Sequence, residues 1–269
     1  MLIDKNCAFD AVHTFECGQC FRWSCDESGM YTGIADGRVC HIRDRELICN
    51  EGDEEYWRSY FAFDTDYAEI HSKLIGMDSK LSKCIKYGNG IRILKQNVWE
   101  AIVSFIISAN NNIPRIKKII ETLCSMYGDE ISDGDNTYYS FPTAERLSTL
   151  ECEDLAPLKA GYRDKYILDA AKKVASGEVD LDAIEKMNDA DARKALMKIK
   201  GVGGKVADCI MLFSLERYSV FPTDVWIKRI LKDVYGVEDK EIQSLVAEKY
   251  GNLAGFAQQY LFYYYRDNS

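Results

Sequence analysis

Residues 191–224, DARKALMKIKGVGGKVADCIMLFSLERYSVFPTD, decide the fold of this chain. Apolar residues at positions 192, 195, 196 and 199 follow the spacing of a helix with one apolar face. Gly201, Gly203 and Gly204 then end that helix, because glycine adopts a positive φ without strain. A second helix is predicted from Lys205. The pattern indicates two helices joined by a tight glycine hairpin.

The hairpin has the properties of an anion-binding site. Its three glycines leave backbone N–H groups uncovered at the positive end of the second helix. Such a helix N-terminus suits a phosphate group. Gly201, Gly203 and Gly204 therefore predict a contact with the backbone of a nucleic acid.

Lys205 is the candidate nucleophile. An ammonium in the first turn of a helix opposes the helix dipole, and desolvation would also lower its pKa, leaving a nucleophilic amine. Cys209 shares its helical face at i+4, and Asp224, after Pro222-Thr223, is typical of an N-cap. We expect Lys205 and Asp224 to meet in one cleft. An exposed lysine and an ordinary capping aspartate fit the same spacing.

The composition is that of a folded protein. The chain has 269 residues, 47% of them hydrophobic and 29% charged, enough for a core in one large or two small domains. Residues 1–5 do not resemble a signal peptide, and the longest apolar run, residues 101–109, is shorter than the roughly 18 residues of a membrane span. We therefore expect a cytoplasmic bacterial or archaeal protein that acts at the nucleoid, with reduced thiols.

The sequence CGQC at positions 17–20 has the spacing of a redox or zinc pair. No second pair follows at zinc-ribbon spacing, and His13, His41 and His71 form no cluster. The spacing alone gives only weak support for zinc.

The net charge of −9 argues against nucleic acid, because phosphate binding normally depends on lysine and arginine. The acids, however, crowd residues 51–55 and 151–154, away from the hairpin. The cations that flank the hairpin are Lys194, Lys198, Lys200, Lys205, Lys228 and Arg229. We expect a dipolar surface with one basic face.

The pattern of the chain changes once. Up to about residue 60, aromatic and β-branched residues alternate, and Asp36-Gly37 between two apolar runs predicts a hairpin turn. Helical stripes then begin at Val98, at Ile116 after Pro114, and at Ile167. The expected fold class is α+β.

The change of pattern also divides the chain. An N-terminal antiparallel sheet domain with helices is predicted at residues 1–95. A mostly α-helical domain that carries the helix-hairpin-helix motif is predicted at residues 96–269.

Residues 199–224 resemble the helix-hairpin-helix DNA glycosylases, and in particular the 8-oxoguanine DNA glycosylase/lyases. Four further segments agree in the same order: Glu16–Trp23 (ECGQCFRW), Ser108–Arg115 (SANNNIPR), Gly161–Arg163 (GYR) and Ala257–Phe262 (AQQYLF). The resemblance covers nearly the whole chain. It implies base-excision repair of duplex DNA, with removal of 8-oxoguanine and cleavage at the abasic site.

The resemblance also implies roles for the lysine and the aspartate. Lys205 would attack C1′ of the damaged nucleotide, expel the base and form a Schiff base that permits β-elimination. Asp224 would stabilise the positive charge that grows at C1′ and help manage the lysine proton. Glycosylases that use water as the nucleophile carry another residue at the position of Lys205.

Lesion recognition depends on N7, which is an acceptor in guanine and an N–H in 8-oxoguanine. The resemblance places the main-chain carbonyl of Gly18 at that N–H, Cys209 and Phe262 on the two faces of the extruded base, and Gln258 at its Watson–Crick edge. Taken singly, Cys209 would be a buried thiol, Phe262 a core aromatic and Gln258 a surface amide.

Extruding a base leaves a gap in the duplex. Asn110 and Tyr162 match the residues that fill this gap in the family. Arg115 and Arg163 match the pair that holds the orphaned cytosine through its acceptors, which implies a preference for cytosine opposite the lesion. Either arginine alone could be a helix-surface cation.

Two positions depart from the family. Trp226 stands where eukaryotic members carry a histidine near the lesion's phosphate, and Lys200 stands where a proline usually precedes Gly201. The lysine could add a phosphate contact or loosen the turn.

The family also suggests which ions are bound. Its hairpin binds a structural cation through main-chain carbonyls, here those of Met197, Ile199 and Val202. No cysteine follows Cys209, so the iron–sulfur cluster of related branches is not expected, and no cofactor is required.

Two other functions stay open. A glycosylase for alkylated purines would keep Asp224 but would need neither Lys205 nor Gly18. A catalytically silent DNA-binding module would use the hairpin for phosphates alone. The intact lysine–aspartate pair favours the bifunctional enzyme, acting as a monomer on DNA and not at a membrane.

Overall fold

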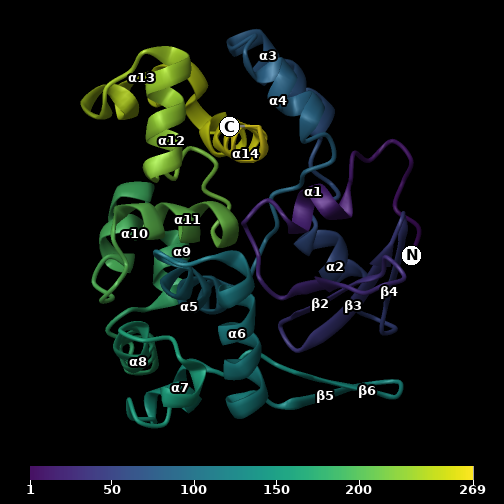
Figure 1. The fold of residues 1–269 in the computed structure, drawn as a ribbon, viewed down its shortest axis with the longest axis vertical. Coiled ribbons are helices and arrows are strands. Elements are labelled where there is room, and N and C mark those ends of the chain that lie inside the picture. The colour runs from purple at the N-terminus through teal and green to yellow at the C-terminus, as the bar shows by residue number, and fades with distance from the viewer. Residues whose placement is uncertain (269) are drawn as a thin grey trace.

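A computed structural model describes residues 1–268 of the chain and confirms the α+β class (Figure 1). The N-terminal sheet is antiparallel, with the strand order β1-β2-β3-β4. Its strands are β1 (Trp23–Cys25), β2 (Tyr31–Ala35), β3 (Arg38–Arg43) and β4 (Glu46–Cys49). Asp36 and Gly37 form the predicted β2–β3 turn with φ values of 47° and 71°, because a two-residue hairpin turn of this type needs a positive φ at both positions.

An aromatic core lies under this sheet. Phe15 stacks on Trp23 with their ring centroids 4.0 Å apart, and the ring of Trp57 lies 5.9 Å from that of Trp23. A Cβ at Gly33 would overlap the Trp23 indole, so the strand can carry only glycine there. Burying one such aromatic side chain contributes about 1.5–3 kcal/mol, which makes these rings the main support of the small sheet.

Helices make up most of the remaining chain. The helices before residue 95 are α1 (Ala11–Phe15), α2 (Glu54–Tyr60), α3 (Tyr67–Met77) and α4 (Leu81–Tyr87). Those after it are α5 (Val98–Ser108), α6 (Ile113–Tyr127), α7 (Ala144–Ser148), α8 (Arg163–Ala175), α9 (Leu181–Lys186), α10 (Asp189–Leu196), α11 (Gly204–Ser214), α12 (Val225–Ile230), α13 (Ile242–Tyr250) and α14 (Ala254–Asp267). Short 3-10 turns are η1 (Ala156–Leu158), η3 (Asp239–Glu241) and η4 (Gly251–Leu253), and a π turn is η2 (Leu231–Tyr235). The three predicted helical stripes fall in α5, α6 and α8.

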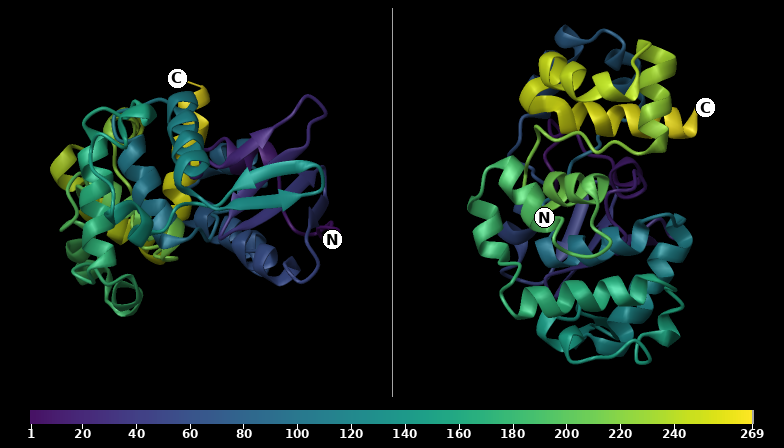
Figure 2. Two further views of the ribbon diagram at one scale, coloured as in Figure 1. Left: turned by 90° about the horizontal axis from the view of Figure 1, so that it is seen from below. Right: turned by 90° about the vertical axis from the view of Figure 1, so that its left-hand side faces the viewer.

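A second antiparallel hairpin, β5 (Glu130–Asp133) and β6 (Asn136–Tyr139), interrupts the helical part. The helical period did not predict it. Figure 2 shows this hairpin reaching across to the N-terminal sheet. There His41 Nε2 on β3 lies 2.7 Å from a carboxylate oxygen of Asp133. The hairpin thus joins the two parts of the chain.

Helices α3 and α4 precede residue 95 but lie beside the C-terminal helix α14 (Figure 1). His71 Nε2 on α3 lies 2.6 Å from the Tyr260 hydroxyl oxygen on α14, and the rings of Tyr67 and Phe256 are 5.6 Å apart. The N-terminal part of the chain therefore supports the helix that carries Gln258 and Phe262. A domain boundary near residue 95 stays a prediction.

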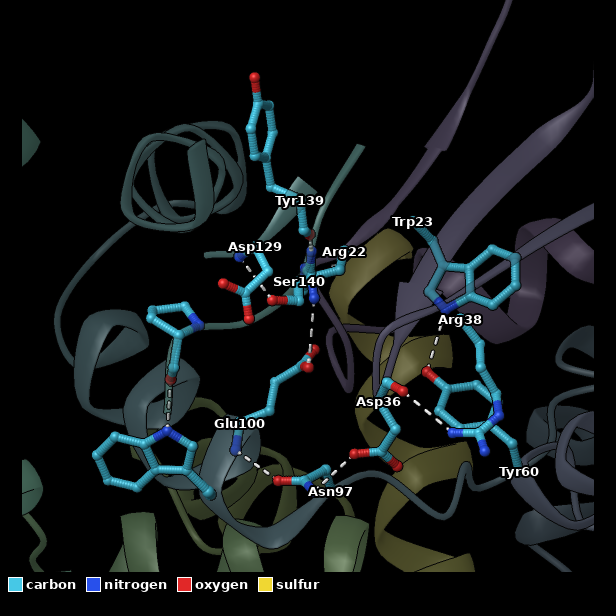
Figure 3. Close-up of polar contacts among 12 residues, drawn as sticks. Arg22, Trp23, Asp36, Arg38, Tyr60, Asn97, Glu100, Asp129, Tyr139 and Ser140 are labelled. Atoms are coloured by element: carbon cyan, nitrogen blue, oxygen red, sulfur yellow. Dashed lines mark hydrogen bonds and ion pairs between the residues drawn. The ribbon is translucent and has the colours of Figure 1, made fainter. Parts of the chain in front are cut away.

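A polar cluster fixes the start of α5 against the sheet (Figure 3). The Arg22 guanidinium donates to the Tyr139 carbonyl, and its Nη1 lies 3.5 Å from Glu100 Oε2 on α5. The Asn97 amide, which precedes α5, donates to Asp36 at 2.7 Å. Burial raises the pKa of the Glu100 carboxyl to about 7, although Arg22 favours the charged form.

Candidate active site

The glycine hairpin forms between α10, which ends at Leu196, and α11, which begins at Gly204 with Gly203 as its N-cap. Of its glycines, only Gly201 has a positive φ, at 87°. A Cβ there would lie 2.5 Å from the ring of Tyr166 on α8. Both observations exclude a larger residue at position 201. The first backbone N–H groups of α11 are left for an anion, as helix geometry requires.

Helix α8 holds the hairpin through contacts that the sequence did not suggest. The backbone N–H of Lys200 donates to Asp169 Oδ2 at 2.8 Å, and Lys173 Nζ donates to the Lys198 carbonyl at 2.6 Å. A proline at position 200 has no N–H and could not make the first contact. Lys200 therefore secures the turn instead of loosening it.

Lys205 and Asp224 occupy the heads of two helices. Asp224 is the N-cap of α12, and its Oδ1 accepts the N–H of Ile227 at 2.8 Å, as predicted. The Lys205 side chain is half-buried and hydrogen-bonds to Cys209, one helical turn away. Asp224 lies near enough to act on its charge. The structure thus brings the three residues together.

The pKa of Lys205 is raised from its ordinary value, so the expectation of a lowered pKa was wrong. The neighbouring Cys209 sulfur is the largest cause, burial of the ammonium opposes it, and Asp224 raises the pKa further. Burial in turn raises the pKa of the Cys209 thiol. The neighbouring groups outweigh desolvation, and the lysine must lose a proton before it can attack.

Helices α11 and α14 carry the residues that are expected to hold the extruded base. The two helices are in contact, because a Cβ at Gly255 on α14 would overlap the Leu212 side chain on α11. Gln258 follows Gly255 by three residues and so continues its face, and Cys209 precedes Leu212 in the same way. Both residues are buried, and Gln258 Oε1 has no hydrogen-bond partner within residues 1–268. A buried acceptor without a partner is uncommon in folded proteins, so this oxygen is available to a donor.

Gly18 lies against the same helix, α14. It has a φ of 83°, and a Cβ built on it would lie 3.5 Å from Cε1 of Phe262, which is half-buried on α14. Phe262 follows Gln258 by four residues on the same helical face. The structure therefore brings together Gly18, Gln258 and Phe262, which lie far apart in the sequence. Gln258 is not the surface amide of the simpler interpretation.

The residues assigned to the opposite base lie at the ends of α5, α6 and α8. Asn110 is exposed with a φ of 52°, and Tyr162 is exposed just before α8. Arg163, however, is buried and donates to the carbonyls of Ala109 at 2.6 Å and Asn110 at 2.9 Å. Its Nη1 also donates to the Ala160 carbonyl at 3.1 Å. It is not a surface cation.

Arg115 approaches the same turn from α6. It is exposed, and its Nη2 donates to the Lys159 carbonyl at 3.0 Å. Lys159 and Ala160 are neighbours, so the two arginines converge on one segment, η1 and the residues after it. In the structure without DNA both guanidinium groups are engaged by the protein itself.

The expected basic face is partly neutralised. Four of the cations that flank the hairpin form ion pairs: Lys194 with Asp191, Lys200 with Asp169, Lys228 with Asp239, and Arg229 with Asp233. Lys198 is exposed and forms no ion pair within the described part of the chain. Trp226 is 46% exposed on α12, with the Arg229 guanidinium 6.0 Å from its ring centroid. The surface around the hairpin is therefore less basic than its composition suggests.

Cys17 and Cys20 are buried free thiols, and burial raises the pKa of each. Cys17 Sγ donates to the Thr14 carbonyl at 3.1 Å. No group of three or more His, Cys, Asp or Glu side chains is arranged to hold a metal ion in residues 1–268. The pair is a packing element of the Gly18 loop.

None of the helices within residues 1–268 is both long and apolar enough to cross a bilayer.

A separate pocket of about 600 Å³ lies between β1, α6 and the β5–β6 hairpin. Its lining includes Arg22, Lys117 and Tyr139, but neither Lys205 nor Asp224. Lys117 Nζ donates to the Trp23 carbonyl at 2.9 Å, so its ammonium group is already hydrogen-bonded within the protein. This pocket is not part of the candidate active site.

Two family models together match residues 1–254. The N-terminal domain of 8-oxoguanine DNA glycosylase matches residues 1–102, and the HhH-GPD superfamily of base excision DNA repair proteins matches residues 103–254. The N-glycosylase/DNA lyase of Saccharomyces cerevisiae is 31% identical over 309 residues, which cover 93% of this chain and 82% of the yeast protein.

Solved structures agree with this assignment. The 8-oxoguanine glycosylase/lyase of Clostridium acetobutylicum, in complex with double-stranded DNA containing cytosine opposite to 8-oxoguanine, is 40% identical with a TM-score of 0.91, over 100% of this chain and 98% of that one. MBOgg1, in complex with a low-affinity DNA ligand, is 47% identical with a TM-score of 0.92, over 97% and 93% of the two chains. The chain belongs to the HhH-GPD superfamily of base excision DNA repair proteins, in the group whose N-terminal domain is that of the 8-oxoguanine DNA glycosylases.

Proposed function

We propose that the protein is a bifunctional DNA glycosylase/lyase that excises 8-oxoguanine from duplex DNA, with cytosine as the preferred opposite base. The observation that carries the proposal is the meeting of Lys205, Cys209 and Asp224, together with a buried Gln258 carbonyl that has no partner within residues 1–268. A base turned out of the duplex would bring donors for such a carbonyl.

Lys205 is the proposed nucleophile. Once deprotonated, its amine attacks C1′, the bond from C1′ to N9 of the base breaks, and the base leaves with the electron pair. The resulting amine adduct opens to a Schiff base, from which the 3′ phosphate is lost by β-elimination. Asp224 is fixed as an N-cap, so its carboxylate can stabilise the positive charge at C1′ without rearranging.

The lesion is recognised in this proposal by four residues. The Gly18 carbonyl accepts the N7–H of 8-oxoguanine, which guanine lacks. Cys209 and Phe262 cover the two faces of the base, and Gln258 pairs with its Watson–Crick edge. The gain of one hydrogen bond contributes on the order of 1–3 kcal/mol to the preference for the lesion.

The opposite strand is held from the turns next to α5 and α8. Asn110 and Tyr162 fill the gap, and Arg115 with Arg163 donates to the acceptors of cytosine. Arg163 must first release the carbonyls of Ala109 and Asn110. Phosphates lie on the hairpin at Gly201, Gly203 and Gly204.

The same assignment covers the remaining properties. The carbonyls of Met197, Ile199 and Val202 can bind a structural cation at the hairpin, and the chemistry above requires no cofactor and no iron–sulfur cluster. We further propose a monomer that acts on chromosomal DNA in the cytoplasm.

A glycosylase for alkylated purines remains the second candidate, because it would use the same fold and Asp224. It would not need an amine at position 205. Borohydride trapping separates the two: the reductant converts a Schiff base between Lys205 and the sugar into a permanent link.

The test compares duplexes with 8-oxoguanine opposite cytosine and undamaged duplexes, with Lys205→Gln as the variant. We expect a covalent protein–DNA band with the lesion only, and none with Lys205→Gln. Folded, DNA-binding wild-type protein that gives no band would reject the lysine mechanism on this substrate.

A further inference from the structure

Gly18, the residue proposed to read the lesion, has no side chain. The direction of its main-chain carbonyl therefore depends on the contacts that hold the backbone. Within residues 1–268 no hydrogen bond engages its carbonyl, whereas the carbonyls of Cys17 and Gln19 on either side are both in use. We propose that Gln19, Gln259 and Gln96 form a clamp of positioning residues that sets the selectivity for 8-oxoguanine. The inference rests on the proposed role of Gly18.

Gln19 is the centre of this glutamine clamp. Its side chain is fully buried, and Nε2 donates to the carbonyls of Thr14 at 2.9 Å and Arg92 at 2.7 Å. Its Oε1 accepts the N–H of Leu94 at 2.9 Å. The amide thus uses donors and acceptor together, which fixes both the position and the rotation of the residue after Gly18.

Gln259 and Gln96 hold the two flanking peptides from opposite sides. Gln259 on α14 donates to the Cys17 carbonyl at 3.0 Å, and Gln96, just before α5, donates to the Gln19 carbonyl at 2.8 Å. Gln259 is adjacent to Gln258, so one helix both reads the base and positions the loop opposite it. The clamp therefore ties the Gly18 loop both to α14 and to the residue before α5.

The arginine behind the clamp makes it rigid. Arg92 is buried, and its guanidinium donates to the carbonyls of Phe61 at 2.8 Å and Ala8 at 2.9 Å. Its own carbonyl is the one that Gln19 binds. The Gly18 loop is thus tied to a fully satisfied polar core and not to a mobile surface.

The selectivity for 8-oxoguanine over guanine should depend strongly on how firmly the glutamine clamp holds the Gly18 loop. A carbonyl that accepts N7–H of the lesion meets a lone pair in guanine, and the difference falls off as distance and angle relax. A loop that drifts by a few tenths of an ångström loses the bond to 8-oxoguanine and the repulsion of guanine together. The attack of Lys205 on an abasic site involves no base and should not depend on the loop.

Methionine is close to glutamine in size but offers no amide, so Gln259→Met removes the contact to Cys17 with little change in volume. Gln19→Met removes the centre of the clamp, and Gln243→Met, on the exposed side of α13, is the matched control. Two rates are measured for each protein: single-turnover release of 8-oxoguanine opposite cytosine, and β-elimination at a preformed abasic site. Thermal unfolding identifies variants that do not fold.

We expect Gln259→Met to release 8-oxoguanine about tenfold more slowly, the value of one hydrogen bond, and to cleave abasic sites within about twofold of wild type. Gln19→Met should release 8-oxoguanine more slowly still, and Gln243→Met should release it at the wild-type rate. If Gln19→Met does not fold, Gln259→Met decides the question.

A parallel fall of both rates, or an unchanged release of 8-oxoguanine in folded Gln259→Met, would overturn the clamp. The proposed function is tested separately by the wild type. If wild-type protein cleaves abasic sites but does not distinguish 8-oxoguanine from guanine, the role of Gly18 fails, whatever the variants do.

Discussion

The two regions that would meet a damaged base pair are built differently. The residues proposed to hold the lesion include two acceptors without a hydrogen-bond partner in residues 1–268, Gln258 Oε1 and the Gly18 carbonyl. The turns proposed for the opposite base are exposed at Asn110 and Tyr162. Arg163, however, is buried and donates to a carbonyl of its own chain.

The two regions therefore differ in what DNA binding would cost: one has free acceptors, and the other has hydrogen bonds that must first be broken. If Gln258 and Gly18 read the lesion as proposed, their free acceptors would add directly to recognition. Arg163 would have to give up its hydrogen bonds to Ala109 and Asn110 before it could bind cytosine. Helix α5 joins the regions, since it packs against α11 and ends just before Ala109.

The largest expected effect tests the preorganised side. Asp224→Asn keeps an oxygen for the N-cap bond to Ile227 but removes the negative charge beside Lys205. We expect release of 8-oxoguanine to slow by about a hundredfold or more, with unfolding temperature nearly unchanged. Single-turnover assays measure this. A loss below about threefold would show that the preorganised charge contributes little.

Arg163→Gln tests the opposite-base side. Glutamine cannot span the carbonyls of Ala109 and Asn110 as a guanidinium does, nor donate twice to cytosine. We expect the ratio of excision opposite cytosine to excision opposite adenine to fall by about tenfold. Hydrogen exchange should be faster in residues 109–112. Arg146→Gln, on the exposed side of α7, serves as the control.

The pH dependence of stability tests the helix between the regions. The pKa of Glu100 is raised from 4.5 to about 7, so between these values the folded state holds a proton that the unfolded state has lost. Stability should therefore fall as pH rises through this window. Denaturant unfolding at about pH 5 and pH 8 should show a drop that Glu100→Gln reduces by about 1–3 kcal/mol. The exposed Glu121→Gln should leave the drop as it is.

The smallest expected effect is a change in the pKa of Lys205, the proposed nucleophile. Cys209 is the largest cause of the raised pKa of Lys205, so Cys209→Ala should lower that pKa. More of the amine is then neutral at a given pH, and Schiff-base trapping on abasic DNA should shift toward lower pH. This substrate has no base, so a lost stacking contact does not interfere. A profile that stays in place, or moves to higher pH, would contradict the assignment.

What the sequence predicted has local causes. The helix-hairpin-helix motif rests on spacing within 34 residues, and the Asp36-Gly37 turn on a dipeptide that suits positive φ. The β5–β6 hairpin was missed because its strands have four residues each and no buried face. Asp133-Gly134 was the available turn signal, without apolar runs on either side.

The contacts that were missed join distant residues. Gln19 meets Arg92 and Leu94 across more than 70 positions, and Arg163 meets Ala109 across 54. No periodicity encodes such pairs. The raised pKa of Lys205 was missed because the dipole argument left out the side chains around the amine: Cys209, one turn along the same helix and the largest cause, and Asp224 from another helix.

Arg163 also has a consequence for how the protein searches a genome. A guanidinium held on the carbonyls of Ala109 and Asn110 contributes little to the grip on phosphates along an intact duplex. If Arg163 holds the opposite base as proposed, it leaves these carbonyls only where an unpaired base replaces the bonds that it gives up. We therefore expect short residence on undamaged sequence and longer residence where a base has left the helix.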